Sequence, residues 1–386
     1  MKYTIFIRGK NWSFQLARAL DDKQKLKYLV TSYPKFYIEK FNVNRDKIKS
    51  VIIIEILSRI LSKLFKFLKK IKINFDHQLF IESLSERIYS SFYLKKTEFC
   101  ILGFGNCSLK IINKAKKLNI KTIYFLNNSS PDFRKKLRLE YKKLGLLDYF
   151  KEENHKITQN INESIKKADF VGAISTFQKK TYVDSGILDP SKVLQLHTIG
   201  FDPNIFYTKN YNKKKFIVTA VGNDFIRKGF KYLVDGFNKL DLENSELWII
   251  GNNDINLINK IVKLKKNNYF FKANQLDLPD YYNKSSIFCL PTLEEGAPAV
   301  IGEAMACGLP ILVTKNCQGP DVIDNEKNGF IIEEQNSDII AEKIKFFYDN
   351  PQVLVNMSNA ASNYAHTNMT IDFQVSKIVD FIEKNK

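Results

Sequence analysis

Two glutamates, Glu295 and Glu303, stand eight residues apart in the segment EEGAPAVIGEAMACG, which spans residues 294–308. Only glycine, proline and small or apolar residues separate them. Pro298 suits the first position of a helix, and Gly308 suits the position just past its end. We therefore expect a helix here, with Glu303 in its second turn and Glu295 in the loop before it.

The amino end of this expected helix has the chemistry to bind a sugar nucleotide. Its free N–H groups and its dipole favour a phosphate, and Gly296 and Ala297 let a ligand approach the backbone. Carboxylates accept hydrogen bonds from paired hydroxyls, which ribose and hexoses supply. A glutamate near a helix start is also ordinary dipole compensation, so the residues alone leave both interpretations open.

Length and charge divide the chain of 386 residues into two unlike parts. The net charge is +19, yet residues 1–200 hold 39 Lys and Arg against 18 Asp and Glu, while residues 201–386 hold 21 against 23. A basic first half favours an anionic partner such as a membrane surface, a phosphorylated acceptor or nucleic acid. Base composition of the genome and solubility could produce the same asymmetry.

The five cysteines show no metal-binding spacing and are typical of free thiols in a reducing cytoplasm. The amino-terminal apolar run is too short for a signal peptide, and no apolar run of about 18 residues could span a membrane. We therefore expect a cytoplasmic protein.

Short apolar runs alternate with amphipathic segments in both halves, which predicts two α/β domains with mostly parallel sheets. We expect a first domain over residues 1–200, a second over 201–370, and a closing helix over 371–386 that crosses back to the first. The polar, turn-forming segment 201–215 is the best boundary. Ligands of such sheets bind at the carboxyl ends of the strands, so two facing domains predict a site in the cleft between them.

One segment does not fit this alternation. Residues 47–72 read as a helix with an apolar face and an opposite basic face, and they include eight Lys or Arg residues and one acid, Glu55. Such a helix can lie in a membrane interface; the alternative is an apolar face that packs on its own domain.

The segment CLPTLEEGAPAVIGEAMACGLPILVTKNCQGPDVIDNEKNGFII resembles the signature of the retaining glycosyltransferases of family 4, which have the two-domain GT-B fold. Glu295 and Glu303 match that family's E-x7-E pair. The resemblance extends to VGNDFIRKGFKYLVDGF, ADFVGAISTFQKKTYVDSGI, HTIGFDPNIF and LVTSYPKF. It is specific in the second half and weaker in the first.

The resemblance implies a role for each matching residue on the donor side. Glu303 would accept the nucleotide ribose hydroxyls, and Glu295 would contact the donor sugar. Lys228 would neutralise the departing diphosphate. The other residues implied at the donor are Gly9, Gly222, Gly296, Ala297 and Pro298. The resemblance calls for no metal and no cofactor besides the nucleotide-sugar donor.

Two departures from the family's pattern stand out. Asn223 occupies the position where the family usually has an arginine of the Arg-x4-Lys pair, and Arg227 is the candidate replacement. The loop FLNNSSPDFR lacks the histidine that members often carry, so Asn128, Ser129 and Arg134 are the candidates for the acceptor side. Arg134, Lys135, Lys136 and Arg138 form a basic cluster that either contacts an anionic acceptor or is a solvated helix face.

These observations lead us to expect a retaining, metal-independent glycosyltransferase. Its acceptor would be a surface glycan or a lipid-linked saccharide at the inner face of the cytoplasmic membrane. The alternatives are a GT-B protein with weakened catalysis, a protein that binds anionic surfaces or nucleic acid, and a sugar-nucleotide epimerase or phosphorylase. No nucleic-acid-binding module is recognisable, so nucleic acid is not the expected partner.

Overall fold

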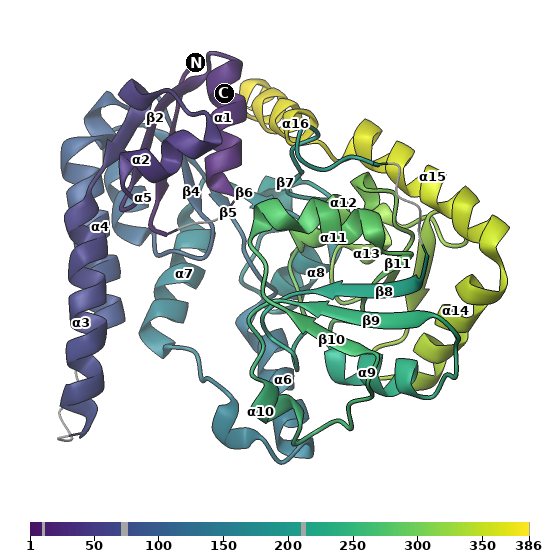
Figure 1. Ribbon diagram of the computed structural model, residues 1–386. Helices are drawn as coiled ribbons and strands as arrows, with labels where there is room; N and C mark the ends of the chain where they lie inside the picture. The colour runs from purple at the N-terminus through teal and green to yellow at the C-terminus, as the bar shows by residue number, and fades with distance from the viewer. Residues whose placement is uncertain (10–11, 71–75, 210–213, 386) are drawn as a thin grey trace.

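The structure is a computed structural model that describes residues 1–386 except 10–11, 71–75, 210–213 and 386. Two parallel sheets form two α/β domains that stand side by side (Figure 1). The first sheet has the order β3-β2-β1-β4-β5-β6-β7. Its strands are β1 (Tyr3–Ile7), β2 (Leu26–Thr31), β3 (Ile48–Ser50), β4 (Phe99–Gly103), β5 (Lys121–Phe125), β6 (Phe170–Ala173) and β7 (Val193–Gln195).

The second sheet has the order β10-β9-β8-β11-β12-β13. Its strands are β8 (Phe216–Val221), β9 (Ser245–Ile250), β10 (Asn268–Phe271), β11 (Ile287–Leu290), β12 (Ile311–Thr314) and β13 (Gly329–Ile332). All pairs in both sheets are parallel, so the predicted fold of two Rossmann-like domains is confirmed.

Helices cover the sheets of both domains. Those of the first half are α1 (Ser13–Asp22), α2 (Lys35–Ile38), α3 (Ile52–Lys70), α4 (His77–Phe92), α5 (Leu109–Lys117), α6 (Pro131–Lys143), α7 (His155–Lys167) and α8 (Thr176–Asp184). Those of the second half are α9 (Phe230–Asn238), α10 (Ile255–Ile258), α11 (Leu278–Lys284), α12 (Ala299–Ala306), α13 (Gly319–Val322), α14 (Ser337–Asp349), α15 (Pro351–Asn368) and α16 (Ile371–Lys384).

The strand order reverses beside the central strand of each sheet. In the first sheet β1 lies between β2 and β4, and in the second β8 lies between β9 and β11. Ligands of open parallel sheets bind outside the carboxyl ends of strands at such points. Gly9 follows β1, Gly222 and Asn223 follow β8, and residues 291–298 follow β11. The candidate residues therefore lie at the positions that the topology favours.

One predicted helix differs from the structure. The segment 47–72 begins with an edge strand, β3, because Ile48 pairs with Leu29 of β2, and the helix α3 starts only at Ile52. The helix α10 is short and ends at Ile258. Beyond it, turn hydrogen bonds such as Lys260 N–H to Leu257 C=O replace a continuous helix.

Two helices cross from one half of the chain to the other. The buried side chains of α16, such as Val375 and Ile378, share an apolar cluster with β1 and α1, and Figure 1 shows α16 beside α1. In the opposite direction, Leu137 of α6 belongs to the core of the second domain. These exchanges fix the two domains against each other.

The chain passes between the domains at two adjacent places. The first passage is at Phe201 and the second is at residues 369–371. The two are joined by hydrogen bonds, because Phe201 N–H donates to Met369 C=O (3.1 Å) and Phe201 C=O accepts from Ile371 N–H (2.9 Å). Gly200 has φ +85°, and a Cβ there would lie 2.7 Å from the Cα of Ile371. Only glycine fits both this backbone conformation and this approach.

Candidate functional site

Glu303 lies in the second turn of α12 and is almost completely buried. Its carboxylate accepts hydrogen bonds from Gln275 Nε2 (3.0 Å) and from the Tyr282 hydroxyl (3.4 Å). Burial raises the pKa of Glu303 to about 7, and these two hydrogen bonds only partly offset the rise. Glu303 is therefore a buried acceptor that hydroxyl donors from a ligand can satisfy.

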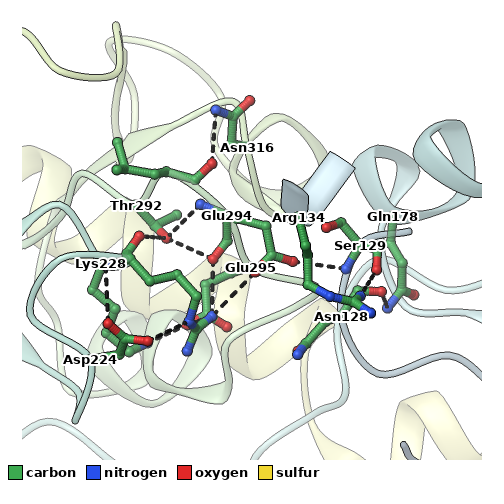
Figure 2. Close-up of polar contacts among 12 residues, drawn as sticks. Asn128, Ser129, Arg134, Gln178, Asp224, Lys228, Thr292, Glu294, Glu295 and Asn316 are labelled. Carbon is green, nitrogen blue, oxygen red and sulfur yellow. Dashed lines mark hydrogen bonds and ion pairs between the residues drawn. The ribbon is translucent and has the colours of Figure 1, made fainter. Parts of the chain in front are cut away.

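Glu295 lies in the loop before α12, in a very different electrostatic environment (Figure 2). Its Oε1 is 2.6 Å from Lys228 Nζ and 2.8 Å from Arg227 Nη1. Burial alone would raise the pKa of Glu295, but the ammonium and the guanidinium outweigh burial and lower it below its ordinary value. The two carboxylates that look alike in the sequence therefore carry opposite pKa shifts.

The structure places Pro298 one position earlier than expected, as the residue before α12 rather than its first residue. Its φ of −67° is compatible with both positions, but its ψ of 119° is extended, so the helix begins at Ala299. Gly308 follows the helix with φ +79°, as expected for the position after a helix end.

Gly222 and Lys228 fit together at the end of β8. A Cβ on Gly222 would lie 2.0 Å from Lys228 Cδ. A side chain at position 222 would therefore displace the lysine from Glu295. Glycine at position 222 therefore leaves the space that the Lys228 side chain needs to reach Glu295.

Asn223 does not supply the cation that the family usually has at this position. Its Oδ1 accepts a hydrogen bond from the Asn252 N–H (2.8 Å), which joins the loops after β8 and β9. Arg227 does reach the site: its Nη1 contacts both Glu295 Oε1 and the Glu294 carbonyl oxygen (3.0 Å). Two cations therefore converge on Glu295 despite the substitution at 223.

Gly296 and Ala297 are in contact with the first domain. A Cβ on Gly296 would lie 2.1 Å from Asn127 O, and the Gly296 carbonyl accepts a hydrogen bond from Ser175 Oγ (2.7 Å). Ala297 belongs to the apolar cluster of the first domain. The small residues at 296 and 297 let two domains approach, and the structure shows this approach where the sequence suggested a ligand.

Glu294 is a site residue that the sequence analysis missed. It is fully buried, and its Oε1 accepts a hydrogen bond from the Ser129 N–H across the domain boundary (2.8 Å). Its Oε2 lies 3.5 Å from Arg227 Nη1. In the sequence, Glu294 is visible only as the neighbour of Glu295. Nothing in the sequence shows that its side chain faces the first domain.

The acceptor-side candidates Asn128, Ser129 and Arg134 belong to the first domain, and Figure 2 shows them near Glu294. Asn128 C=O accepts from Gln178 Nε2 (3.1 Å), and Arg134 donates to Ser129 C=O while pairing with Glu153. The rest of the basic cluster is also partnered: Lys135 pairs with Asp132, Arg138 with Glu152, and Lys136 lies over the ring of Phe133. Its contacts therefore match a neutralised helix face.

Gly9 follows β1 with φ +94°, and a Cβ there would meet no atom within 4 Å. Its neighbour Arg8 pairs with Glu82 of α4. Residues 10–11 lie outside the described part of the chain. Among the residues that the structure describes, His, Cys, Asp and Glu side chains form no group suited to holding a metal ion.

Comparisons with known proteins find a family match in the second half of the chain. Residues 202–365, which carry Lys228, Glu295 and Glu303, match the family described as glycosyl transferases group 1. The match covers 164 of the 386 residues. The matched residues form the second domain almost entirely.

Two relatives illustrate the similarity. An uncharacterized glycosyltransferase of Haemophilus influenzae is 31% identical over 190 residues, which cover 46% of this chain and 52% of the relative. An N,N'-diacetylbacillosaminyl-diphospho-undecaprenol alpha-1,3-N-acetylgalactosaminyltransferase of Campylobacter jejuni is 25% identical over 231 residues, covering 58% of this chain and 60% of the relative. The chain thus spans about half to three fifths of these relatives' lengths.

A solved structure shows the same fold over the whole chain. The Anabaena protein HepE in complex with UDP superposes with a TM-score of 0.72 at 13% identity, and the superposition covers 100% of both chains. This likeness establishes the GT-B architecture for both domains.

Proposed function

We propose that this protein is a retaining glycosyltransferase. It transfers a sugar from a nucleoside-diphosphate sugar to a surface-glycan or lipid-linked saccharide acceptor. The observation that carries the proposal is the arrangement at the switch point of the second sheet. There, two cations contact Glu295, and the buried Glu303 accepts a hydrogen bond from the Tyr282 hydroxyl. The family match of residues 202–365 and the UDP complex of HepE support the class of donor.

Each residue has a role in this proposal. Glu303 accepts the ribose hydroxyls, and Glu295 accepts hydroxyls of the donor sugar. Lys228 and Arg227 bind the diphosphate, whose charge exceeds that of one carboxylate. When the donor binds, the diphosphate takes over the two cations and releases Glu295 to the sugar.

The reaction keeps the configuration of the sugar. The bond from the anomeric carbon to the phosphate oxygen breaks, and a bond to the acceptor oxygen forms on the same face. The acceptor's proton passes to the departing phosphate oxygen. Lys228 and Arg227 stabilise the negative charge that grows on the diphosphate, and preorganised charge of this kind is often the largest contribution to catalysis. The proposal requires no metal ion.

The acceptor side is proposed to lie at the inner face of the cytoplasmic membrane. None of the helices in the described residues is both long and apolar enough to span a bilayer. On α3, however, Ile53, Ile56, Ile60 and Leu64 are each about half exposed, along one face of the helix. Such a stripe can lie in a membrane interface.

The exposed stripe is distinct from the face that packs on the domain. Ile54 is buried in an apolar cluster of the first domain that includes Val30 of β2 and Ile81 of α4. Leu57 and Leu61 pack against this cluster. The exposed basic residues Arg59 and Lys63 lie along one side of the stripe. This arrangement suits an anionic lipid surface, and the C. jejuni relative's name places its acceptor on diphospho-undecaprenol.

Thermal unfolding with UDP, GDP and ADP tests the donor part of this proposal. We expect one of the three to raise the melting temperature, since a ligand that binds only the folded state stabilises it. A chain that none of them stabilises would not be a nucleotide-sugar enzyme.

A second candidate is a GT-B protein that binds a sugar nucleotide with little turnover. The observation that favours it is Asn223, whose amide is engaged with Asn252 and brings no positive charge. Release of radiolabelled sugar from nucleotide sugars separates the two functions. Binding without release of sugar to acceptor or water would favour the second, and conversion of one nucleotide sugar into another would indicate an epimerase.

A further inference from the structure

A cavity of about 1090 Å³ is lined by residues of both domains, and Glu294 and Arg227 are among them. The first domain contributes α6, the short 3-10 helix Leu147–Tyr149 and α7 to its wall. The second domain contributes the loops after β8 and β9, including Asn223 and Arg227. Its volume is slightly above the range of about 300–1,000 Å³ for small-ligand sites, so it has room for a ligand larger than one sugar.

Three buried oxygens in the wall of this cavity accept no hydrogen bond from any described residue. They are Glu294 Oε2, Asn162 Oδ1 on α7, and Asn253 Oδ1 after β9. Buried polar atoms are nearly always partnered, so each exception needs an explanation. All three are acceptors, and they come from both domains. A ligand that satisfies them must bring several hydrogen-bond donors.

The charges of the wall exclude an anion as the preferred ligand. Seven Asp and Glu residues line the cavity against five Lys and Arg residues. Most of the cations are already paired: Arg134 with Glu153, Lys135 with Asp132, and Arg227 with Asp224 and Glu295. A phosphate or carboxylate ligand would meet more negative than positive charge.

Aromatic rings supply the apolar part of the wall. Tyr141 and Phe150 pack edge to face with their ring centroids 5.3 Å apart, and Tyr149 is partly exposed beside them. Rings of this kind pack against the C–H faces of sugars while neighbouring oxygens accept the hydroxyl protons. A ligand that carries several hydrogen-bond donors, has no charge and offers apolar C–H faces fits this wall, and a neutral saccharide has all three properties.

The cavity is connected to the donor side through Glu294 and Arg227. Arg227 Nη1 contacts Glu295 Oε1 (2.8 Å), the Glu294 carbonyl (3.0 Å) and Glu294 Oε2 (3.5 Å). A saccharide in the cavity would therefore end next to the residue proposed to hold the donor sugar.

We propose that this cavity binds an uncharged oligosaccharide portion of the acceptor, of more than one sugar unit, with Glu294, Asn162 and Asn253 accepting its hydroxyl hydrogens. This inference rests on the proposed transferase function and specifies the acceptor. It predicts that the acceptor is recognised by its sugars at this site, whereas any lipid or phosphate portion lies elsewhere.

Saturation-transfer NMR on the full chain tests the inference. The probes are the neutral tetrasaccharides maltotetraose, cellotetraose and chitotetraose, with a heparin-derived tetrasaccharide as the anionic comparison. We expect at least one neutral probe to bind and the anionic one to bind more weakly. Asn162→Leu and Asn253→Leu should each weaken binding at least fivefold. Asn160→Leu, on the same helix but away from the cavity, should leave it unchanged.

Two results would overturn the inference. One is that no neutral probe binds, or that binding survives in both cavity variants, which would show that the cavity is not a saccharide site. The other is that UDP displaces the saccharide, which would place the saccharide in the donor site. Stabilisation by UDP is measured separately, so this inference can fail while the transferase function stands.

Discussion

At the scale of single residues, the two glutamates of the E-x7-E pair differ in their surroundings. Glu303 is buried without a cation and has a raised pKa, while Glu295 is held by two cations and has a lowered pKa. A carboxylate with a pKa near 7 is partly protonated at neutral pH, and a protonated carboxyl is a poorer acceptor for two ribose hydroxyls. The donor affinity therefore depends on the ionisation of Glu303.

We predict that UDP-glucose binds more weakly at low pH. Binding favours the ionised form of Glu303, so affinity should fall about tenfold between pH 8 and pH 6, as a pKa near 7 requires. UDP-glucose does not itself titrate in this range. Calorimetric titration at several pH values measures the effect. In Glu303→Gln, which has no ionisable group here, the slope should disappear, and a slope that persists would assign the pH dependence to another residue.

We predict separate effects for the two carboxylates. Glu303→Ala removes hydrogen bonds to a charged acceptor, worth about 1.5–3 kcal/mol, so the Kd for UDP should rise by roughly 10–100-fold. Glu295→Ala should leave UDP affinity nearly unchanged and mainly lower the turnover. Paired binding and rate measurements check this difference. Equal and negligible effects of both changes would remove these residues from the site.

We predict that Lys228→Met lowers kcat by about 10²–10³-fold, as expected when one preorganised charge at a developing anion is lost. Arg227 remains beside Glu295 and should keep part of the activity. Lys231→Met, on the neighbouring helix α9, is the matched control because its ammonium pairs with Asp235. If the two changes reduced kcat equally, the assignment of Lys228 to the diphosphate would be wrong.

At the scale of elements, α3 has two apolar faces with different partners. One face packs within the first domain, and the other is exposed beside Arg59 and Lys63. The helical period predicted an amphipathic helix, but it could not show how much of the apolar side the domain covers. That depends on the packing of α3 and α4, which brings together residues distant in sequence.

We predict that Ile56→Ser combined with Ile60→Ser abolishes binding to liposomes that contain phosphatidylglycerol. Each fully buried side chain of this size contributes about 1.5–3 kcal/mol. Co-sedimentation at low and high salt measures the binding, and Lys63→Gln should weaken it mainly at low salt. Val355→Ser on α15, with 51% exposure, is the control. Binding that survives the double change would place the membrane contact elsewhere.

The elements also show what the sequence could predict. Alternating strands and helices revealed both sheets, because each strand is a local apolar run. The edge strand β3 was taken as helix because its pairing with β2 is not local. At the site, the E-x7-E pair and Lys228 were visible from the family resemblance. The meeting of Glu294 with Ser129 was not, since 165 positions separate them and only domain docking joins them.

At the scale of the whole molecule, α16 ties the end of the second half to the first domain. Ile378 is fully buried there, next to side chains of α1. We predict that Ile378→Ala lowers the free energy of unfolding by about 2–5 kcal/mol, the usual range for such a truncation in a core. Urea unfolding followed by tryptophan fluorescence and circular dichroism measures the loss. Asp380→Asn, exposed on the same helix, should change little, and equal stability of both variants would contradict this packing.

The paired crossings at Phe201 and Thr370 have a consequence for how the molecule can come apart. The chain enters the second domain at Phe201 and returns to the first domain at Thr370, and these two residues are paired. The second domain is therefore inserted between two segments of the chain that lie side by side. A protease that cuts the chain at one crossing would leave both halves tethered by the other, and by the packing of α16. The two domains would separate only after both connections were severed.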